Sequence, residues 1–289
     1  MKILLLGAGG MAGHVIYTVL NETKQYELLG TINSTKFKDE NIHLDIYDIE
    51  KLNGIIDGFS PDVIINSVGV LIKGSKENPE NAIYANAYFP NYLAKIAQKK
   101  KIKLIHISTD CVFSGSTGTY TESSVKDATD VYGLSKNLGE IIDDNNLTIR
   151  TSIIGPELKS NGEGLFHWFM HQKEKIYGYK SNMWSGVTTL ELAKFIQWML
   201  SSKINLTRLI HLTNNCPISK FDLLTIVNEN FEKKIKILDE KDFVSNKSFI
   251  STRKDFDFPV KSYNEMIRDL KIFMLSHEDL YGNYFTIDK

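Results

Sequence analysis

Lys2-Ile3-Leu4-Leu5-Leu6-Gly7-Ala8-Gly9-Gly10-Met11-Ala12-Gly13 is the stretch from which the architecture of the chain can be predicted. Its first five residues are mostly apolar and predict a strand that is buried on both faces. Gly7, Gly10 and Gly13 follow at three-residue spacing, and a helix is expected from Met11 to Leu20. A glycine turn between a strand and a helix lets the backbone approach a pyrophosphate at the helix N-terminus. The stretch therefore predicts an α/β fold with a dinucleotide site.

The rest of the chain divides into two regions of different pattern. Residues 1–155 alternate predicted strands and helices, as in a Rossmann-type, doubly wound parallel sheet. After Pro156 the chain becomes a polar loop and then an aromatic-rich segment. We expect a NAD(P)-binding domain at 1–155 and a smaller, mainly C-terminal substrate-binding lobe at 156–186 and 214–289. Residues 187–213, with a short strand at 209–212, are expected to return to the sheet.

Composition restricts the classes of function. The 289 residues are 42% hydrophobic and 24% charged, as in a soluble globular protein with a sizeable core. A net charge of −1 gives no field that favours nucleic acid, and no apolar run is long enough to span a membrane. Cys111 and Cys216 lack metal-ligand spacing, and the apolar start is too short for a signal peptide. We expect a cytoplasmic protein without a metal site.

The end of the second predicted strand, at residues 27–33, indicates the preferred cofactor. A carboxylate at this point would bind the ribose 2′-hydroxyl of NAD and repel the 2′-phosphate of NADP. The chain reads Thr31-Ile32-Asn33-Ser34-Thr35-Lys36, with hydroxyls, an amide and a lysine but no acid. Asn33, Ser34 and Lys36 therefore favour NADPH. Use of NADH stays open, because no arginine is present to grip the phosphate.

Two further elements frame this site. A buried strand ends in the small-residue turn Ser67-Val68-Gly69. A long helix is predicted over residues 78–101, and Pro90 should kink or break it near Tyr88-Phe89, because proline removes a helical hydrogen bond.

Tyr132-Gly133-Leu134-Ser135-Lys136 places a tyrosine and a lysine one turn apart on a helix predicted over residues 131–143. An ammonium group beside a phenol stabilises the phenolate and lowers a tyrosine pKa of about 10, as proton transfer requires. Ser108-Thr109 ends a buried strand, where a hydroxyl could hold a substrate oxygen beside the phenol. The alternative for Tyr132 and Lys136 is a solvated surface pair.

Taken together, the glycine turn, Ser108-Thr109-Asp110-Cys111-Val112-Phe113 and the Tyr132 helix resemble the dTDP-4-dehydrorhamnose reductase family. This family lies in the extended short-chain dehydrogenase/reductase superfamily. Its members carry a Ser-Thr-Asp-Tyr-Val-Phe segment before a Tyr-x-x-x-Lys helix. Cys111 replaces the usual aromatic residue, so the pocket wall should differ there.

With the patterns above, the resemblance implies a set of site residues. The catalytic residues would be Thr109, Tyr132 and Lys136. The cofactor would be bound by Gly7, Gly10, Met11, Gly13, Asn33, Ser34, Lys36, Asp45, Ile46, Ser67, Val68, Gly69, Tyr132 and Lys136. The substrate would be bound by Asp110, Cys111, Phe113, Trp184 and Arg253.

Five residues have an alternative, structural interpretation. Asp45 would contact the adenine or cap a helix, and Asn86 would support the lysine through water or lie on a helix surface. Glu122, which matches a family Tyr-x-Glu element, is more simply a solvated loop acid. Arg150 is better explained by a buried carboxylate partner than by the site. Arg253 would bind a diphosphate or form a surface salt bridge.

The resemblance implies NADPH-dependent reduction of the C4 ketone of a nucleotide-linked 4-keto-6-deoxy sugar. The substrate would be dTDP-4-dehydrorhamnose or a UDP-2-acetamido-2,6-dideoxy-4-ulose, in rhamnose or related polysaccharide biosynthesis. The partner would thus be a nucleotide sugar, with neither nucleic acid nor a membrane involved, and a homodimer is left open. Two alternatives remain: an epimerase or dehydratase of the same superfamily, and a non-catalytic NADP-binding regulatory partner of another enzyme.

Overall fold

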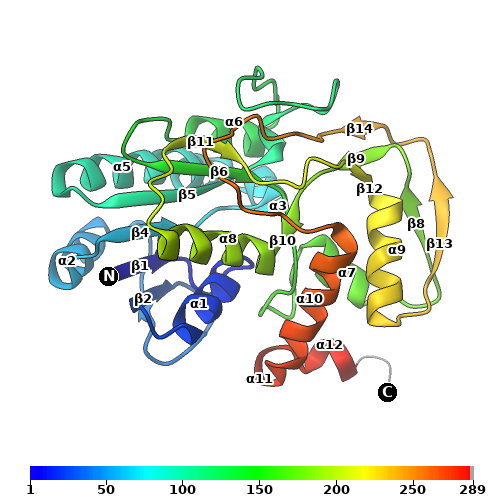
Figure 1. The fold of residues 1–289 in the computed structure, drawn as a ribbon, viewed down its shortest axis with the longest axis horizontal. Coiled ribbons are helices and arrows are strands. Elements are labelled where there is room, and N and C mark those ends of the chain that lie inside the picture. The colour runs from blue at the N-terminus through cyan, green and yellow to red at the C-terminus, as the bar shows by residue number, and fades with distance from the viewer. Residues whose placement is uncertain (287–289) are drawn as a thin grey trace.

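A seven-stranded sheet forms the centre of the larger part of the molecule (Figure 1). The computed structural model describes residues 1–286. The strand order is β11-β6-β5-β4-β1-β2-β3, and every neighbouring pair is parallel. The strands are β1 (Lys2–Leu6), β2 (Glu27–Ile32), β3 (Ile42–His43), β4 (Val63–Asn66), β5 (Lys103–Thr109), β6 (Leu147–Thr151) and β11 (Arg208–His211). The predicted Rossmann-type sheet is confirmed, and β11 shows that the chain returns to it.

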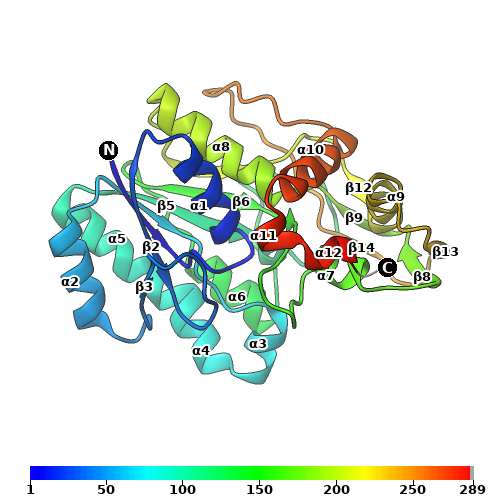
Figure 2. The same ribbon diagram turned by 90° about the horizontal axis from the view of Figure 1, so that it is seen from below.

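Helices cover both faces of this sheet (Figure 2). One face packs against α1 (Gly13–Glu22) and α8 (Thr189–Ser202), and the other against α2 (Ile49–Phe59) and α5 (Phe89–Lys100). Successive residues of β1 alternate between the two cores: Ile3 and Leu5 enter the first, Leu4 and Leu6 the second. The apolar run of β1 is continuous because both faces are buried.

The glycine turn after β1 is held by close packing. Gly7 has a φ of +83°, which favours glycine, and its carbonyl accepts a hydrogen bond from Gly10 N at 3.0 Å. A Cβ atom on Gly13 would overlap with the Gly7 carbonyl oxygen. The third glycine therefore lets α1 pack against the end of β1, and α1 begins at this residue rather than at Met11.

The helix predicted over residues 78–101 is interrupted, as expected. It comprises α4 (Pro79–Ile83), the π-helical turn η1 (Tyr84–Tyr88) and α5, and a short helix α3 (Ile72–Glu77) precedes it. The side chain of Asn78 caps α4 by accepting a hydrogen bond from Asn81 N at 3.0 Å. Pro90 lacks the N–H that a regular helix would need, so the helix widens just before it.

The helix that carries Tyr132 is shorter than predicted. It is α6 (Val131–Leu138), and Asp130 caps it by accepting from Gly133 N at 3.0 Å. The chain leaves the helix at Gly139, where a Cβ atom would overlap with the carbonyl oxygen of Asn86. The prediction of a helix to residue 143 was wrong, because this close crossing turns Glu140 into the interior.

A smaller lobe lies beside the sheet (Figure 1). Its strands form β13-β8 and β12-β9-β14, while β7 and β10 pair near its junction with the sheet. The bounds are β7 (Ile153–Ile154), β8 (Lys175–Tyr179), β9 (Asn182–Trp184), β10 (Val187–Thr188), β12 (Ile218–Ser219), β13 (Lys236–Glu240) and β14 (Ser245–Asn246). The remaining helices are η2 (Asp110–Val112), α7 (Leu165–Met170), α9 (Lys220–Phe231), α10 (Tyr263–Leu275), α11 (Glu278–Tyr281) and α12 (Asn283–Thr286). Within residues 1–286, no helix has the length and apolar character needed to cross a membrane.

Candidate active site

A cleft of about 570 Å³ opens at the carboxyl ends of the parallel strands. Its walls come from the glycine turn, the turn after β4, the end of β5, α6, the end of β6 and residues 152–164 that follow it. Parallel sheets bind ligands at this edge, because the loops that follow neighbouring strands meet there.

Thr109, Tyr132 and Lys136 all line this cleft. Thr109 ends β5, and the other two lie one turn apart on α6. The Thr109 hydroxyl donates to Asp110 Oδ1 at 3.0 Å and accepts from Cys111 N at 3.2 Å, so its position is fixed. The alternative of a solvated surface pair for Tyr132 and Lys136 is wrong, since Lys136 is only 5% exposed.

The protonation of this pair differs from the prediction. Burial raises the pKa of Tyr132, with the Cys111 thiol and Asp110 acting in the same direction, while Thr109 opposes the shift. Burial also lowers the pKa of Lys136 to about 8, against the influence of Glu140, and Lys136 Nζ donates to the Ile107 carbonyl at 2.7 Å. The expected lowering of the phenol pKa is therefore absent from the protein alone. Tyr132 is a neutral phenol, the state that a proton donor requires.

Asn86 joins the turn after β4 to α6. Its Oδ1 accepts from Val70 N at 2.9 Å, and its Nδ2 donates to Val70 O at 3.0 Å and to Ser135 Oγ at 3.2 Å. The side chain is fully buried, so the interpretation as a helix-surface residue was wrong. A water-mediated link from Asn86 to Lys136 remains a proposal.

A second cavity of about 510 Å³ adjoins the cleft on the side of β2. Of the predicted cofactor residues, Gly7, Gly10, Met11, Asn33, Ser34, Asp45, Ile46, Ser67, Val68, Gly69, Tyr132 and Lys136 line one cavity or both. Gly13 lies beneath the turn, and Lys36 is exposed outside both linings. Asp48, not Asp45, caps α2 by accepting from Lys51 N at 2.9 Å, so the helix-cap interpretation of Asp45 was wrong.

Only two of the five predicted substrate residues, Asp110 and Cys111, line the cleft. Phe113 is fully buried and stacks on Tyr120 with ring centroids 4.0 Å apart, while Trp184 is buried in the main core. Both aromatic side chains are buried because their apolar surface is removed from water in the core, and neither lines the cleft.

Arg253 was also wrongly predicted to bind a diphosphate. Its guanidinium group binds the carboxylate of Asp255 and donates to the carbonyls of Thr207 and Leu209, each at 3.0 Å. Each of its three nitrogen atoms therefore donates to a protein acceptor, which matches the salt-bridge alternative.

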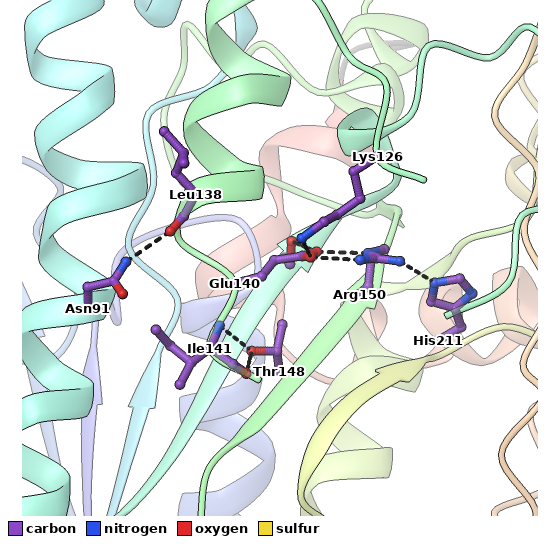
Figure 3. A network of polar contacts seen from close by, with 9 residues as sticks. Asn91, Lys126, Leu138, Glu140, Ile141, Thr148, Arg150 and His211 are labelled. Carbon is purple, nitrogen blue, oxygen red and sulfur yellow. Dashed lines mark hydrogen bonds and ion pairs between the residues drawn. The ribbon is translucent and has the colours of Figure 1, made fainter. Parts of the chain in front are cut away.

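A buried network of charges lies beyond the end of α6 (Figure 3). Glu140 binds Arg150 in a bidentate manner, and it also accepts from Ser108 Oγ at 2.8 Å and Lys126 Nζ at 3.1 Å. Arg150 donates to His211 Nε2 at 2.8 Å. The predicted pairing of Arg150 with a buried carboxylate is confirmed. The network joins the end of α6 to β5, β6 and β11.

Glu122 also links segments that are distant in the sequence. Its carboxylate accepts from His211 N at 3.1 Å, Ser251 Oγ at 3.1 Å and the backbone N–H of Thr252 at 3.0 Å. The interpretation as a solvated loop acid was wrong, because the loop before α6 is tied to segments far away in the chain.

The sequence reasoning missed the loop at residues 157–164. Glu157, Leu158, Lys159, Asn161, Glu163 and Gly164 all line the cleft. The available signal was the position of this polar loop after a strand end at the same edge of the sheet. Its polar composition alone gave no reason to separate it from an ordinary surface loop.

Known proteins place the chain in a family. A family model described as the RmlD substrate binding domain matches residues 1–248. The chain belongs to this family. The resemblance to dTDP-4-dehydrorhamnose reductases is thereby confirmed, within the extended short-chain dehydrogenase/reductase superfamily.

Relatives of the chain carry different names. A dTDP-4-dehydrorhamnose reductase of Aggregatibacter actinomycetemcomitans is 32% identical over 157 residues, which are 52% of this chain and 51% of the relative. The spore coat polysaccharide biosynthesis protein SpsK of Bacillus subtilis is 24% identical over 79% of this chain and 78% of its own. Methionine adenosyltransferase 2 subunit beta of Xenopus tropicalis is 30% identical over 48% of this chain and 41% of its own. The chain spans about half the length of the first curated relatives it matches.

Solved structures agree on the fold. The dTDP-4-dehydrorhamnose reductase of Bacillus anthracis, solved in complex with NADP, gives a TM-score of 0.79 at 21% identity, covering 94% of this chain and 99% of its own. A UDP-glucose 4-epimerase of Thermotoga maritima gives 0.77 at 15% identity, covering 96% and 99%. The fold is therefore shared by reductases and epimerases and does not separate them.

Proposed function

We propose that this protein reduces the C4 ketone of a nucleotide-linked 4-keto-6-deoxy sugar and uses NADPH as the reductant. The observation that carries the proposal is the convergence of Thr109, Tyr132 and Lys136 in one cleft that continues into a second cavity. Residues 1–155 and 187–213 would hold the cofactor, and the remaining segments would hold most of the sugar nucleotide.

The residues of the second cavity fit a dinucleotide. The glycine turn has no room for a side chain at Gly9, since a Cβ atom there would lie 2.9 Å from the Thr35 carbonyl oxygen. Asn33 and Ser34 offer neutral polar groups where a 2′-phosphate would lie, and Asp45 and Ile46 line the adenine side. These features favour NADPH, while NADH stays open.

Each catalytic residue then has a task in the reaction, and Lys136 would also hold the nicotinamide ribose. Bound NADPH supplies the hydride that the ketone carbon accepts. Tyr132, held as a neutral phenol, gives its proton to the forming alkoxide, and the Lys136 ammonium stabilises the phenolate that remains. Thr109 would turn its hydroxyl proton from Asp110 Oδ1 to the carbonyl oxygen and stabilise the charge that develops there.

The names of the reductase relatives support a dTDP-linked sugar as substrate, and a UDP-linked sugar stays open. We propose dTDP-4-dehydrorhamnose or a UDP-2-acetamido-2,6-dideoxy-4-ulose, with Asp110 and Cys111 beside the sugar. Cys111 also argues against a dehydratase, which would place a second acid there. Burial raises the pKa of its thiol to about 12, so it is neutral and a poor acid catalyst.

A second candidate is a cofactor-binding regulatory subunit. The similarity to methionine adenosyltransferase 2 subunit beta favours it. Such a protein would bind NADPH without needing a competent Tyr132, and it would co-purify with a larger enzyme.

NADPH absorbance with purified protein tests the proposal. The panel contains dTDP- and UDP-linked 4-keto-6-deoxy sugars, with and without a 2-acetamido group, each supplied with the 5-epimerising or 3,5-epimerising activity it needs. Decay with one sugar in the wild type, and a loss of about 10²–10⁴-fold in Tyr132→Phe with NADPH binding retained, would support the reductase. Binding of NADPH without decay for any sugar would contradict it and favour the regulatory role.

A further inference from the structure

The two cavities meet at a narrow set of residues. Both are lined by Gly9 and Gly10 of the glycine turn, by residues 67–70 after β4, and by Lys159. Lys159 belongs to the loop after β7, which faces the turn from the other side of the cleft. A dinucleotide that fills both cavities must pass this junction, and the part of it that joins its two nucleosides is the pyrophosphate.

The loop that carries Lys159 is held in place at its base. Glu157 Oε1 accepts from Gly164 N at 2.6 Å, which closes the loop on itself. Tyr284 of α12 anchors it further, because its hydroxyl accepts from Glu157 N at 2.8 Å and donates to Glu157 O at 3.0 Å. Gly164 packs so closely on the Met11 side chain that a Cβ atom there would overlap with it. The loop is therefore fixed against the residue that follows the glycine pair.

A pyrophosphate bound at the junction requires a positively charged side chain nearby. Lys136 and Lys159 are the lysines among the described residues that line the two cavities, and no arginine lines either. Lys136 is bound to the Ile107 carbonyl beside the catalytic tyrosine. Within residues 1–286, Lys159 has no ion-pair or hydrogen-bond partner, and its side chain is exposed. A pyrophosphate carries two negative charges, which the backbone N–H groups of the turn alone would leave without a counter-charge.

We propose that Lys159 binds the cofactor pyrophosphate from the side opposite the glycine turn. This inference rests on the proposed function, because it requires NADPH or NADH in the two cavities. The position of Lys159 at the junction separates it from Asn33 and Ser34, which line the β2 cavity alone. Lys159 thus supplies the cation for the shared pyrophosphate, and the 2′-phosphate is met elsewhere.

Fluorescence titration of the full chain with NADPH and NADH tests this assignment. Lys159→Gln should weaken both cofactors by the same factor, about tenfold, because both carry the pyrophosphate and a charge-assisted hydrogen bond is lost. Lys159→Arg should bind nearly as the wild type does. Lys173→Gln removes an exposed lysine outside both cavities and should leave both affinities unchanged. The affinity for ADP-ribose should fall in Lys159→Gln, whereas that for adenosine 2′-monophosphate should not.

Three results would contradict the inference, and they differ from one another. Unchanged affinities in Lys159→Gln would remove the residue from the cofactor site. Weakening of NADPH alone would assign Lys159 to the 2′-phosphate instead. If the wild type bound neither cofactor, the proposed function itself would fail, and this inference would fail with it.

Discussion

Arg150 donates to both carboxylate oxygens of Glu140, from Nε at 2.8 Å and from Nη2 at 2.6 Å, and neither side chain is exposed to solvent. Glu140 lies just past the end of α6, the helix that carries Lys136, and Ser108, which donates to the same carboxylate, precedes Thr109. The pair therefore holds together β5 and α6, the two elements that carry the proposed catalytic groups. The pair matters for stability because the loss of either partner leaves the other charge buried and unpaired.

Removing one partner of this pair should be costly. Glu140→Leu or Arg150→Met should lower the free energy of unfolding by about 3–5 kcal/mol, and the double variant Glu140→Leu/Arg150→Met should lose less than the sum of the two. Urea denaturation measures all three. Asp144→Asn is the control, because its pair with Arg208 is exposed (83% and 57%) and should contribute at most about 1 kcal/mol. Equal losses in the buried and the exposed pair would refute the argument.

The same pair predicts the direction of the pH dependence of stability. Burial alone would raise the pKa of Glu140, but the hydrogen bonds and charge of Arg150 hold it below its usual value. The unfolded chain therefore binds the proton more readily, and the contribution is complete only above the unfolded pKa of about 4.3. Unfolding experiments should show this stability disappearing as the pH falls below that value. In Arg150→Met, the free energy of unfolding should fall less steeply as the pH is lowered. An unchanged fall would show that other carboxylates cause it.

The close approach of Gly13 to Gly7 gives a prediction with an internal control. Gly13→Ala forces a Cβ atom against the Gly7 carbonyl and should destabilise the fold by about 1–3 kcal/mol, with weaker NADPH binding because the turn must move. Gly54, in the middle of α2, has open space around it. Gly54→Ala should therefore stabilise the protein by about 0.5–1 kcal/mol through helix propensity. Thermal unfolding compares them, and destabilisation of similar size in both would contradict the packing argument.

Local patterns predicted those features of the molecule that depend on short stretches of chain. The apolar β1, the glycine turn, the break before Pro90 and the Tyr132–Lys136 turn each follow from a few adjacent residues. The assignments that failed depend on distant partners. Arg253 is occupied by Asp255 and by carbonyls of residues 207 and 209, and α6 ends where Gly139 crosses Asn86. Lys159 was overlooked because only the folded chain brings its loop to the glycine turn.

The neutral end of β2 predicts how cofactor preference can be changed. Asn33→Asp places a carboxylate beside the second cavity, where it would bind the 2′-hydroxyl of NADH and repel the 2′-phosphate of NADPH. The ratio of kcat/KM for NADPH to that for NADH should fall by about tenfold, which corresponds to about 1.4 kcal/mol. Asn33→Ala serves as the control, since it removes the amide without adding charge and should change the ratio less. An unchanged ratio in Asn33→Asp would place the 2′-position elsewhere.

The pKa of Lys136 predicts an upper pH limit for activity. Burial lowers this pKa to about 8, so the ammonium loses its proton as the pH rises through that value. The positive charge that stabilises the Tyr132 phenolate is then lost, and kcat/KM, which reports the free enzyme, should fall tenfold for each further pH unit. Lys136→Arg keeps its charge at all these pH values, because guanidinium has a pKa above 12. In that variant the maximal rate should be lower, since the guanidinium is larger, but the fall above pH 8 should disappear. Steady-state kinetics between pH 6 and pH 10 measure both profiles, and a fall that persists unchanged in Lys136→Arg would assign the limit to another group.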